Sequence, residues 1–322
     1  MKNMKLEYRR LNLQSIDLDD MTFVFSYGFS LSLLREAIEK IGIINPPLVK
    51  EVTDNRYRIV CGYKRLLICR EIGTKELVSV VLNDHIEDRD AFLISLYDNL
   101  SHRVLNIVEK SIIISKLQNY YSDQMIVETF LPLLGLNPHQ YVLNKTLSLL
   151  TLDEKMRDAV LSGILDGEAA LKLINFSNKD RVSIFEVLSR LRLSKSRQTE
   201  VIENLNDIIK RDGCSISDIF DSKELNVILD SKDLNTPQKG ERVRCFIRRL
   251  RYPKLVKAEE EFIQMRKELK LGDRIKLNHP LFFEGHRYGL QLKFGSIDEL
   301  KDHLKKIDSI KDSKRMKKLI EG

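Results

Sequence analysis

Residues 34–49 read Leu34-Arg-Glu-Ala-Ile-Glu-Lys-Ile-Gly-Ile-Ile-Asn-Pro-Pro-Leu-Val49, and this stretch decides the N-terminal fold. Apolar residues recur at helical spacing over residues 31–41, and Gly42 follows where a glycine commonly ends a helix. Asn45-Pro46-Pro47 then forces the chain to extend, because a residue that precedes proline is kept out of the helical region. Leu48-Val49 begins a strand. The stretch therefore predicts a helix, a sharp stop and a strand in succession.

The residues that follow continue this pattern. Periodicity and turn residues predict a turn at Asp54-Asn55, a return strand at Tyr57-Arg58-Ile59-Val60, a helix over residues 63–72 closed by Gly73, and a buried strand over residues 77–82. The order helix–strand–strand–helix–strand fills roughly residues 1–90. It indicates a small α+β domain.

Beyond Glu87 the periodicity becomes helical. Residues 88–230 contain glycine and Asn-Pro punctuation but no strand signal. The polar, turn-rich segment 231–240 predicts a linker, and residues 241–271 predict a basic helix that Pro253 interrupts. The predicted fold class is α+β: a small α+β domain, an all-α middle domain and a small β-β-α unit. The predicted domain ranges are 1–100, 101–230, 231–270 for the linker and basic helix, and 271–322.

The C-terminal unit is predicted to dimerise. Residues 274–277 and 288–294 alternate with period two and predict a hairpin, and Ser296 with Glu299 forms a capping box for a last helix. The apolar face of that helix is formed by Ile297, Leu300, Leu304 and Ile307. A unit this small cannot bury both of its faces alone, so a homodimer is the natural remedy.

Composition excludes several classes of protein. The chain has no run of about 18 apolar residues and no apolar segment near its start, so we expect no transmembrane helix and no secretory signal. Its four cysteines, Cys61, Cys69, Cys214 and Cys245, form no CxxC pair and have no metal-ligand spacing. Buried, reduced thiols in a cytoplasmic protein are expected.

The charge is concentrated toward the end of the chain. Residues 241–322 hold 22 Lys and Arg against 13 Asp and Glu, although the whole chain has a net charge of only +7. Two basic stripes carry the excess: Arg242, Arg244, Arg248, Arg249, Arg251, Lys254 and Lys257, then Lys311, Lys314, Arg315, Lys317 and Lys318. This distribution favours nucleic acid as a partner through phosphate contacts. A solvated basic helix without a ligand is the alternative.

The middle of the chain contains a possible helix-turn-helix. The first helix is predicted over residues 126–134, with Pro132 inside it, followed by a turn at Gly135-Leu136. Asn137 is the predicted cap and Pro138 the first helical residue of a second helix that runs to residue 150. Its predicted DNA-facing residues are His139, Gln140, Asn144 and Lys145. A purely structural helix pair is the alternative.

At this point the sequence resembles the ParB family of partition proteins. The first family box, a helix, Gly, Asn-Pro-Pro and a strand, is similar to residues 34–49, and the second, Gly-x-Arg-Arg, is similar to Gly62-Tyr63-Lys64-Arg65. The third, Glu-Asn-x-x-Arg followed by Leu-Asn-x-x-Glu, resembles Asp98-Asn99-Leu-Ser-His-Arg103 with Leu105-Asn106-Ile-Val-Glu109. Two later stretches, from Leu147 to Arg157 and from Leu271 to Leu277, look like the segment after the family's helix-turn-helix and the start of its dimerisation unit. Five boxes in order make the resemblance strong.

The resemblance implies a CTP pocket in residues 1–100. Its nucleotide-binding residues would be Gly62, Tyr63, Lys64, Arg65, Asn99 and Arg103. The chemistry of the second box agrees, because a glycine lets the backbone approach a phosphate and the amides of a helix start donate to it. Lys64 and Arg65 would add charge-assisted hydrogen bonds. A plain strand-to-helix turn beside a solvated face is the alternative.

The third box implies a Mg²⁺ site. Asp98 and Asn99 offer oxygen ligands, and Arg103, one turn beyond Asn99, is expected on the same helix face. An acidic residue that interacts with a helix dipole is the alternative. Asp98 stands where the family has Glu, and Lys64 where it has Arg, which loses the bidentate fork. Nucleotide binding is therefore expected to survive better than turnover, and weak CTPase activity stays an open question.

The family resemblance implies a cytoplasmic, nucleoid-associated DNA clamp. Its partners would be double-stranded DNA, a second copy of the chain and a ParA-type ATPase, and its task the segregation of a chromosome or plasmid. A transcription regulator or nucleoid-occlusion protein of the same architecture is one alternative. A small-molecule kinase or nuclease on the same N-terminal fold is another, and a kinase would need a carboxylate such as Glu36 or Glu39 beside the phosphate loop. No site is predicted in residues 175–230.

Overall fold

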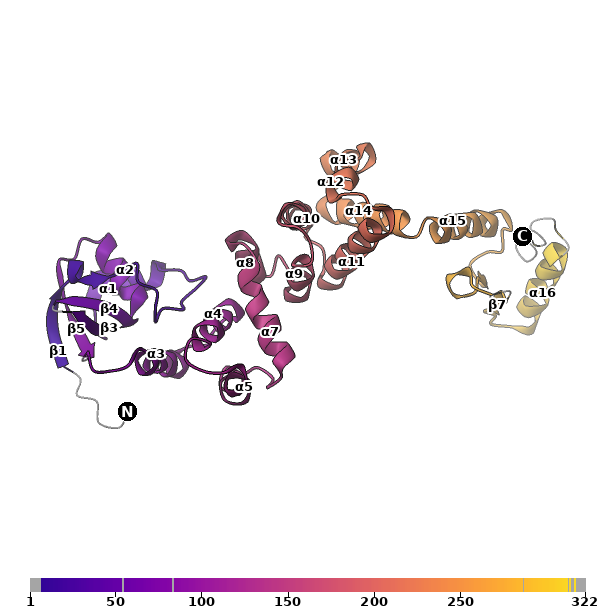
Figure 1. Ribbon diagram of the computed structural model, residues 1–322. Coiled ribbons are helices and arrows are strands. Elements are labelled where there is room, and N and C mark those ends of the chain that lie inside the picture. Colours follow the sequence, from indigo (N-terminus) through magenta and orange to yellow (C-terminus); the bar gives the residue numbers. More distant parts are fainter. Residues whose placement is uncertain are drawn as a thin grey trace. The chain divides into compact units, whose positions relative to one another are not determined.

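The structure is a computed structural model that describes residues 7–311 except Asp54, Asn83 and His286, together with Ser313 and Met316. Its contacts divide the chain into two compact units, one ending at Arg181 and the other beginning at Val182 (Figure 1). The predicted α+β class is confirmed: a mixed sheet with helices comes first, then a long helical region, then a hairpin with one helix.

The first unit contains the sheet and most of the predicted middle domain. Its elements are β1 (Glu7–Asn12), β2 (Ile16–Asp17), α1 (Ser32–Ile41), β3 (Leu48–Thr53), β4 (Arg56–Cys61), α2 (Tyr63–Glu71), β5 (Glu76–Leu82), α3 (Asp88–His102), α4 (Ile107–Leu117), α5 (Asp123–Met125), α6 (Leu131–Leu133), α7 (Gln140–Ser148), α8 (Glu154–Leu161) and α9 (Gly167–Leu173). Helix α10 (Asn178–Leu191) crosses the division between the units.

The sheet has five strands in the order β1-β5-β3-β4-β2. β3 pairs antiparallel with β4 and parallel with β5, so the predicted hairpin and the predicted buried strand lie side by side. β1 and β2 add one strand to each edge and were not predicted. The sequence of β1 does not alternate between apolar and polar residues, because Arg9 and Arg10 occupy its middle and only Leu11 is buried.

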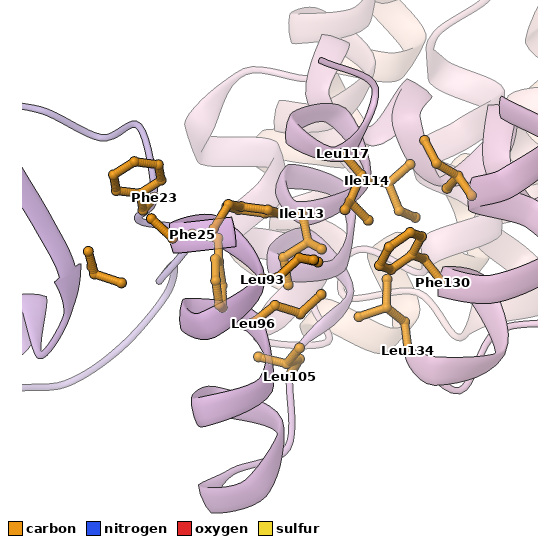
Figure 2. Packing of buried hydrophobic residues seen from close by; sticks show 14 of the residues in the cluster. Phe23, Phe25, Leu93, Leu96, Leu105, Ile113, Ile114, Leu117, Phe130 and Leu134 are labelled. Atoms are coloured by element: carbon orange, nitrogen blue, oxygen red, sulfur yellow. The ribbon is translucent and has the colours of Figure 1, made fainter. Parts of the chain in front are cut away.

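Two hydrophobic clusters hold this unit together. One lies between the sheet and α2, where Val49 and Ile59 pack with Leu66. The other begins at Val60 and Leu82 of the sheet and continues through α3 and α4 to Leu143 of α7. Figure 2 shows Phe23 and Phe25, from the segment before α1, beside the α3 and α4 side chains of this cluster. The sheet and the first helices after it therefore share one continuous core.

The predicted helix-turn-helix needs three corrections. A π-helical segment, Ile126–Phe130, joins α5 to α6, and its wider turns accommodate Pro132, which has no N–H to donate. The cap of α7 is His139 instead of Asn137, and the helix begins at Gln140. Asn137 and Pro138 therefore belong to the turn, and α7 ends at Ser148, two residues before the predicted end.

The second unit contains α11 (Lys195–Asp212), α12 (Ile216–Phe220), α13 (Lys223–Asp230), α14 (Thr236–Arg251), α15 (Pro253–Glu268), β6 (Ile275–Asn278), β7 (Gly289–Leu292) and α16 (Ile297–Lys311). The predicted interruption at Pro253 is confirmed, because this proline starts α15. The linker predicted over residues 231–240 is wrong in its second half. Asn235 and Gln238 form a capping box that starts α14 there, and Gly240 lies inside that helix against Leu193.

The end of the second unit, from β6 to α16, has the predicted order of strand, strand and helix. β6 and β7 pair antiparallel, with Ile275 opposite Leu292 and Leu277 opposite Leu290. One face packs into a small cluster around Phe262 of α15. The predicted apolar face of α16 is largely uncovered, since Ile297 and Leu304 are 72% and 52% exposed.

Candidate functional site

The first and second sequence boxes meet at Gly62. This residue caps the start of α2 with φ of 92°, in the left-handed region that favours glycine. A Cβ at this position would lie 2.8 Å from Cβ of Pro47, the last residue of the Asn-Pro-Pro turn. The close approach leaves no room for a side chain. A glycine is therefore required where α2 starts, and the amides of a helix start are the donors that a phosphate-binding loop uses.

Arg65 ties the same two boxes together. Its Nη1 donates a hydrogen bond to the backbone oxygen of Asn45. Burial lowers the pKa of Arg65, while Cys61 and Asp98 oppose this shift. The guanidinium of Arg65 thus helps to hold the Asn-Pro-Pro turn in place. Removing this side chain would change the conformation of the loop as well as any contact with a ligand.

Lys64 is the less committed cation of the loop. Its Nζ lies 4.4 Å from the centre of the Phe29 ring, and the edge of that ring also meets Tyr63. Burial lowers the pKa of Lys64, the neighbouring Arg103 cation lowers it further, and Glu109 acts in the opposite direction. Within the residues that the structure describes, no hydrogen bond or ion pair is found for this ammonium group. Two cations held close together in this way favour a bound anion.

The end of α3 supplies the second side of the site. Helix α3 ends at His102, and Arg103 follows in extended conformation, so the expectation that Arg103 lies on the helix face is wrong. Its Nε donates to Oδ1 of Asn99 at 2.8 Å, and its Nη1 donates to Oε1 of Glu109 at 2.7 Å. Its Nη2 is buried without a hydrogen-bond partner in the described part of the chain. A buried donor without an acceptor is uncommon and favours an additional ligand there.

Glu109 organises this corner. It is 1% exposed and also accepts hydrogen bonds from the backbone N–H of Asn106 at 3.0 Å and of Tyr27 at 3.2 Å. Asn106 in turn caps α4 and donates from Nδ2 to the backbone oxygen of Tyr27 at 2.9 Å. The segment around Tyr27 is therefore fastened to the third box, which also brings Phe29 to Lys64.

The Mg²⁺ prediction fits Asp98 better than Asn99. Asn99 already uses both ends of its amide, since Nδ2 donates to the backbone oxygen of Ser95 and Oδ1 accepts from Arg103. Asp98 is half-exposed beside Cys61, and burial together with Asp98 raises the pKa of that thiol to about 12. The described residues contain no group of three or more acidic, His or Cys side chains suited to a metal. One carboxylate can still hold Mg²⁺ when the remaining ligands are phosphates and water.

Sequence reasoning missed several residues of this site. Phe29 and Tyr27 belong to no box, and Asn106 and Glu109 were quoted for the resemblance without a role. A capping box between Asn106 and Glu109 is visible in the sequence and could have located the start of α4. Nothing in the spacing of Tyr27 and Phe29 shows that they reach residues about 35 to 80 positions away.

Three of the four predicted DNA-facing residues are exposed around the start of α7. His139, Gln140 and Asn144 are exposed, as is Tyr141 between them. Nε2 of Gln140 donates to Oδ1 of Asn144 at 3.2 Å, so the two amides already form a flat polar pair. Lys145 is half-buried in an ion pair with Glu168 of α9. The geometry leaves a short, exposed polar face at the start of α7.

Several arginines of α14 are neutralised within their own unit. Arg248 binds Glu259 through two hydrogen bonds of 2.7 and 2.8 Å, Arg249 pairs with Glu224, and Arg251 donates to Asp207 at 3.0 Å. These partners belong to helices packed around α14, so the arginines join helices together. In the second basic stripe, Lys311 pairs with Asp308, and the other four residues lie outside the described part of the chain.

The alternative of a kinase finds no support in the position of its candidate carboxylates. Glu36 accepts a hydrogen bond from Lys40 at 2.6 Å, and Glu39 lies 3.8 Å from Arg35, all along α1. None of these contacts reaches the loop at Gly62. Among the described residues, no helix is both long enough and apolar enough to cross a membrane.

Comparison with known proteins agrees with this architecture. The ParB N-terminal domain model matches residues 14–100. The chain is 23% identical over 208 residues to the probable chromosome-partitioning protein ParB of Vibrio cholerae, covering 64% of this chain and 65% of that protein. It is 24% identical over 178 residues to the nucleoid occlusion protein of Bacillus mycoides, covering 55% and 59%. The chain thus spans about six tenths of the length of these relatives.

Two solved structures are also similar to parts of the chain. A ParB from Caulobacter crescentus in complex with the centromeric parS site is 18% identical, with 61% of this chain and 98% of that chain covered and a TM-score of 0.35. The same protein in complex with CTP-gamma-S is 19% identical, covering 56% and 98%, with a TM-score of 0.27. Residues 14–100 thus match the ParB N-terminal domain, and the chain is similar to distant homologues named ParB and nucleoid occlusion protein.

Proposed function

We propose that this chain is a DNA-binding protein whose N-terminal domain binds CTP with Mg²⁺ and which acts as a nucleotide-dependent clamp in partition. One observation carries the nucleotide part. Lys64 has no acidic partner among the described residues, and the buried Nη2 of Arg103 has no acceptor there. The two cations are close enough for Arg103 to lower the pKa of Lys64, which follows the glycine that opens α2 by two residues. A triphosphate supplies the missing acceptors for both groups.

The residues divide the work of binding. Backbone amides at the start of α2 and the ammonium of Lys64 would hold phosphate oxygens, and Arg103 would turn its free Nη2 to them while Glu109 fixes its other end. Asp98 would hold Mg²⁺ against the same phosphates. The choice of CTP rests on the resemblance of the boxes. Whether the bound nucleotide is hydrolysed depends on Asp98, whose side chain is one methylene shorter than the family Glu.

The nucleotide proposal predicts a selective loss of binding in Lys64→Ala. Titration calorimetry of the full chain with CTP, ATP, GTP and UTP in the presence of Mg²⁺ is expected to show CTP binding. Lys64→Ala should weaken it by about tenfold to a hundredfold, because a charge-assisted hydrogen bond to phosphate is lost. Lys40→Ala, on the exposed flank of α1, is the matched control and should leave the affinity unchanged. If no triphosphate binds, with or without DNA, the proposal of a nucleotide pocket is wrong.

The DNA part rests on the exposed polar face of α7. A homodimer through the C-terminal unit would place two such helices on one duplex, and the uncovered apolar residues of β7 and α16 supply its contact surface. The relatives include both partition and nucleoid-occlusion proteins. A ParA-type ATPase gene beside the gene for this chain would favour partition over regulation.

The two predicted DNA-binding sets can be separated by their salt dependence. We expect Lys145 to exchange its partner Glu168 for a phosphate when DNA binds, so Lys145→Ala should reduce the slope of log affinity against log salt by about one. Arg251→Ala should leave that slope unchanged and lower the stability of the second unit, since Arg251 joins α14 to Asp207 of α11. Anisotropy titrations on random-sequence duplex at several salt concentrations measure both slopes. A slope that changes in Arg251→Ala and not in Lys145→Ala would instead assign the phosphate contacts to α14.

A further inference from the structure

A cavity of about 920 Å³ lies within the second unit, between α13, α14 and α15. All three helices contribute apolar side chains to its lining, namely Val227 and Ile228 of α13, Phe246 of α14, and Val256 and Ile263 of α15. Phe246 is buried, whereas Val227 is 70% exposed and Ile263 is 51% exposed. We call this cavity the α14 groove. Its two outer helices thus leave large apolar side chains uncovered, as binding surfaces commonly do.

Two arginines of α14 hold the outer helices of the groove. Arg248 donates to both carboxylate oxygens of Glu259 on α15, at 2.7 and 2.8 Å. Arg249, the next residue, pairs with Glu224 on α13. One ion pair therefore fixes each outer helix to α14. The groove is formed before any ligand is present, which lowers the cost of binding.

The groove continues along α15. A second cavity, of about 360 Å³, shares Glu259 and Ile263 with it and extends past Arg266 to Leu277 and His279 at the end of β6. Because the two cavities adjoin, the concave surface is elongated and follows one helix for about two turns. This shape suits a rod-like occupant better than a compact small molecule.

The charges around the two cavities are unbalanced. Lys223 and Arg242 line the α14 groove and Arg266 lines the adjoining cavity, and all three are exposed. Among the residues that the structure describes, none of these cations forms an ion pair, and Glu260 is the one lining acid in the same condition. Three cations thus face one acid beside an apolar surface. An acidic partner would complement them.

We propose that the α14 groove is a docking site for an acidic amphipathic helix of a partner protein. A helix presents apolar side chains at every third or fourth position, and such a stripe fills an apolar groove between helices. Val227 and Ile263 would cover that stripe from two sides. Acidic residues on the flanks of the helix would meet the three unpaired cations.

Duplex DNA fits the same surface less well. Its phosphate backbone has no apolar stripe to cover Val227 and Ile263, and Glu224 and Glu259 would repel it. The groove contains no residue of the nucleotide site and none of α7. The proposal therefore goes beyond the proposed function, and nucleotide binding by the same variants reports separately on the pocket at Gly62.

The first test uses designed peptides and the full-length chain. The probe is a fluorescein-labelled peptide of about 14 residues, with leucine at every third or fourth position and glutamate on both flanks. Fluorescence anisotropy is expected to show about tenfold tighter binding than for a peptide with lysine in place of each glutamate. A third peptide keeps the glutamates and has two central prolines that prevent a helix, and it should bind about tenfold more weakly than the probe.

The second test changes the groove. Val227→Glu should weaken binding of the acidic peptide at least about tenfold, because it puts a charge on an apolar wall. Val182→Glu, at a position of α10 that is 40% exposed and outside the groove, is the matched control. Arg242→Glu should weaken the acidic peptide and strengthen the lysine peptide, each about fivefold. Lys210→Glu makes the same change in net charge on exposed α11 and should alter neither affinity more than about twofold.

Three results would overturn the proposal. One is an acidic peptide that binds the parent chain no more tightly than the lysine or proline peptide does. Another is an equal effect of Val227→Glu and Val182→Glu while circular dichroism shows both variants folded. The third is random-sequence duplex that loses affinity for Arg242→Glu but not for Lys210→Glu while the acidic peptide fails to bind, which would assign the groove to nucleic acid. A reversal of peptide preference in Arg242→Glu supports the docking site, because a merely structural role of Arg242 would weaken both peptides.

Discussion

Replacing Gly62 by alanine is expected to lower the free energy of unfolding of the N-terminal sheet by about 3 kcal/mol and to abolish nucleotide binding. Two effects add. The left-handed backbone, with φ of 92°, costs a residue with a Cβ about 1 kcal/mol. The new Cβ would also lie 2.8 Å from Cβ and 3.0 Å from Cα of Pro47, and relieving such overpacking costs roughly 1–3 kcal/mol.

Gly73→Ala separates these two effects. Gly73 ends α2 with φ of 76°, and a Cβ there would meet no atom within 4 Å. It shares the strain of Gly62 without the steric conflict, so about 1 kcal/mol is expected. The chain has two units, so the free energy of opening is measured locally, by hydrogen exchange of the β3, β4 and α2 amides. Equal losses at both glycines would show that the Pro47 contact adjusts at no cost, and that the close packing of the two boxes is unimportant.

The sequence predicts this corner well because its signals are local. A helix stop at Gly42, the Asn-Pro-Pro turn and a glycine before α2 each act on their own backbone, and the structure has all three. The same holds for the start of α15 at Pro253. Patterns of this kind need no information about which distant side chain will be the neighbour.

The errors arise where tertiary contacts outweigh a local signal. Thr236-Pro-Gln-Lys-Gly240 has the composition of a turn, yet its capping box and the fit of Gly240 against Leu193 make it helix. Three arginines of the predicted basic stripe, Arg248, Arg249 and Arg251, connect α14 to other helices, because their acidic partners lie on those helices. Charge counted along one helix does not show such partners.

The candidate site shows the same division. Spacing identifies Gly62, Lys64 and Asp98, which stand in recognisable boxes. It does not show that Arg103 leaves the helix to bind Glu109, or that Tyr27 is fastened beside it. These contacts depend on the fold of the segment between β2 and α1, which has no secondary structure over most of its length. A short box therefore predicts candidate site residues more reliably than it predicts the contacts that each of them makes.

Glu109→Gln is expected to destabilise the first unit by about 3 kcal/mol, and to weaken nucleotide binding even though Glu109 touches no ligand. The carboxylate accepts hydrogen bonds from Arg103, Asn106 and Tyr27 in a position that is 1% exposed. A glutamine amide has one oxygen, and its NH₂ group would face at least one of these donors. Removing one partner of a buried ion pair commonly costs about 3–5 kcal/mol, and the similar shape of glutamine keeps the loss near the lower value.

Two comparisons test whether the loss of stability comes from the buried ion pair or from any Glu→Gln change in a helix. Glu128→Gln, at an exposed position where Gln124 already donates to it, should change stability by less than about 0.5 kcal/mol. In a double-mutant cycle with Arg103→Met, the two single losses should exceed the loss in the double variant by about 1–3 kcal/mol, since removing both charges leaves neither one unpaired. Denaturant unfolding of the full-length chain, with hydrogen exchange at α3 and α4 to locate the transition, measures each corner of the cycle. Additive losses would mean that Arg103 and Glu109 do not depend on each other. The guanidinium would then be free to reorient toward a phosphate without the carboxylate that we expect to hold it.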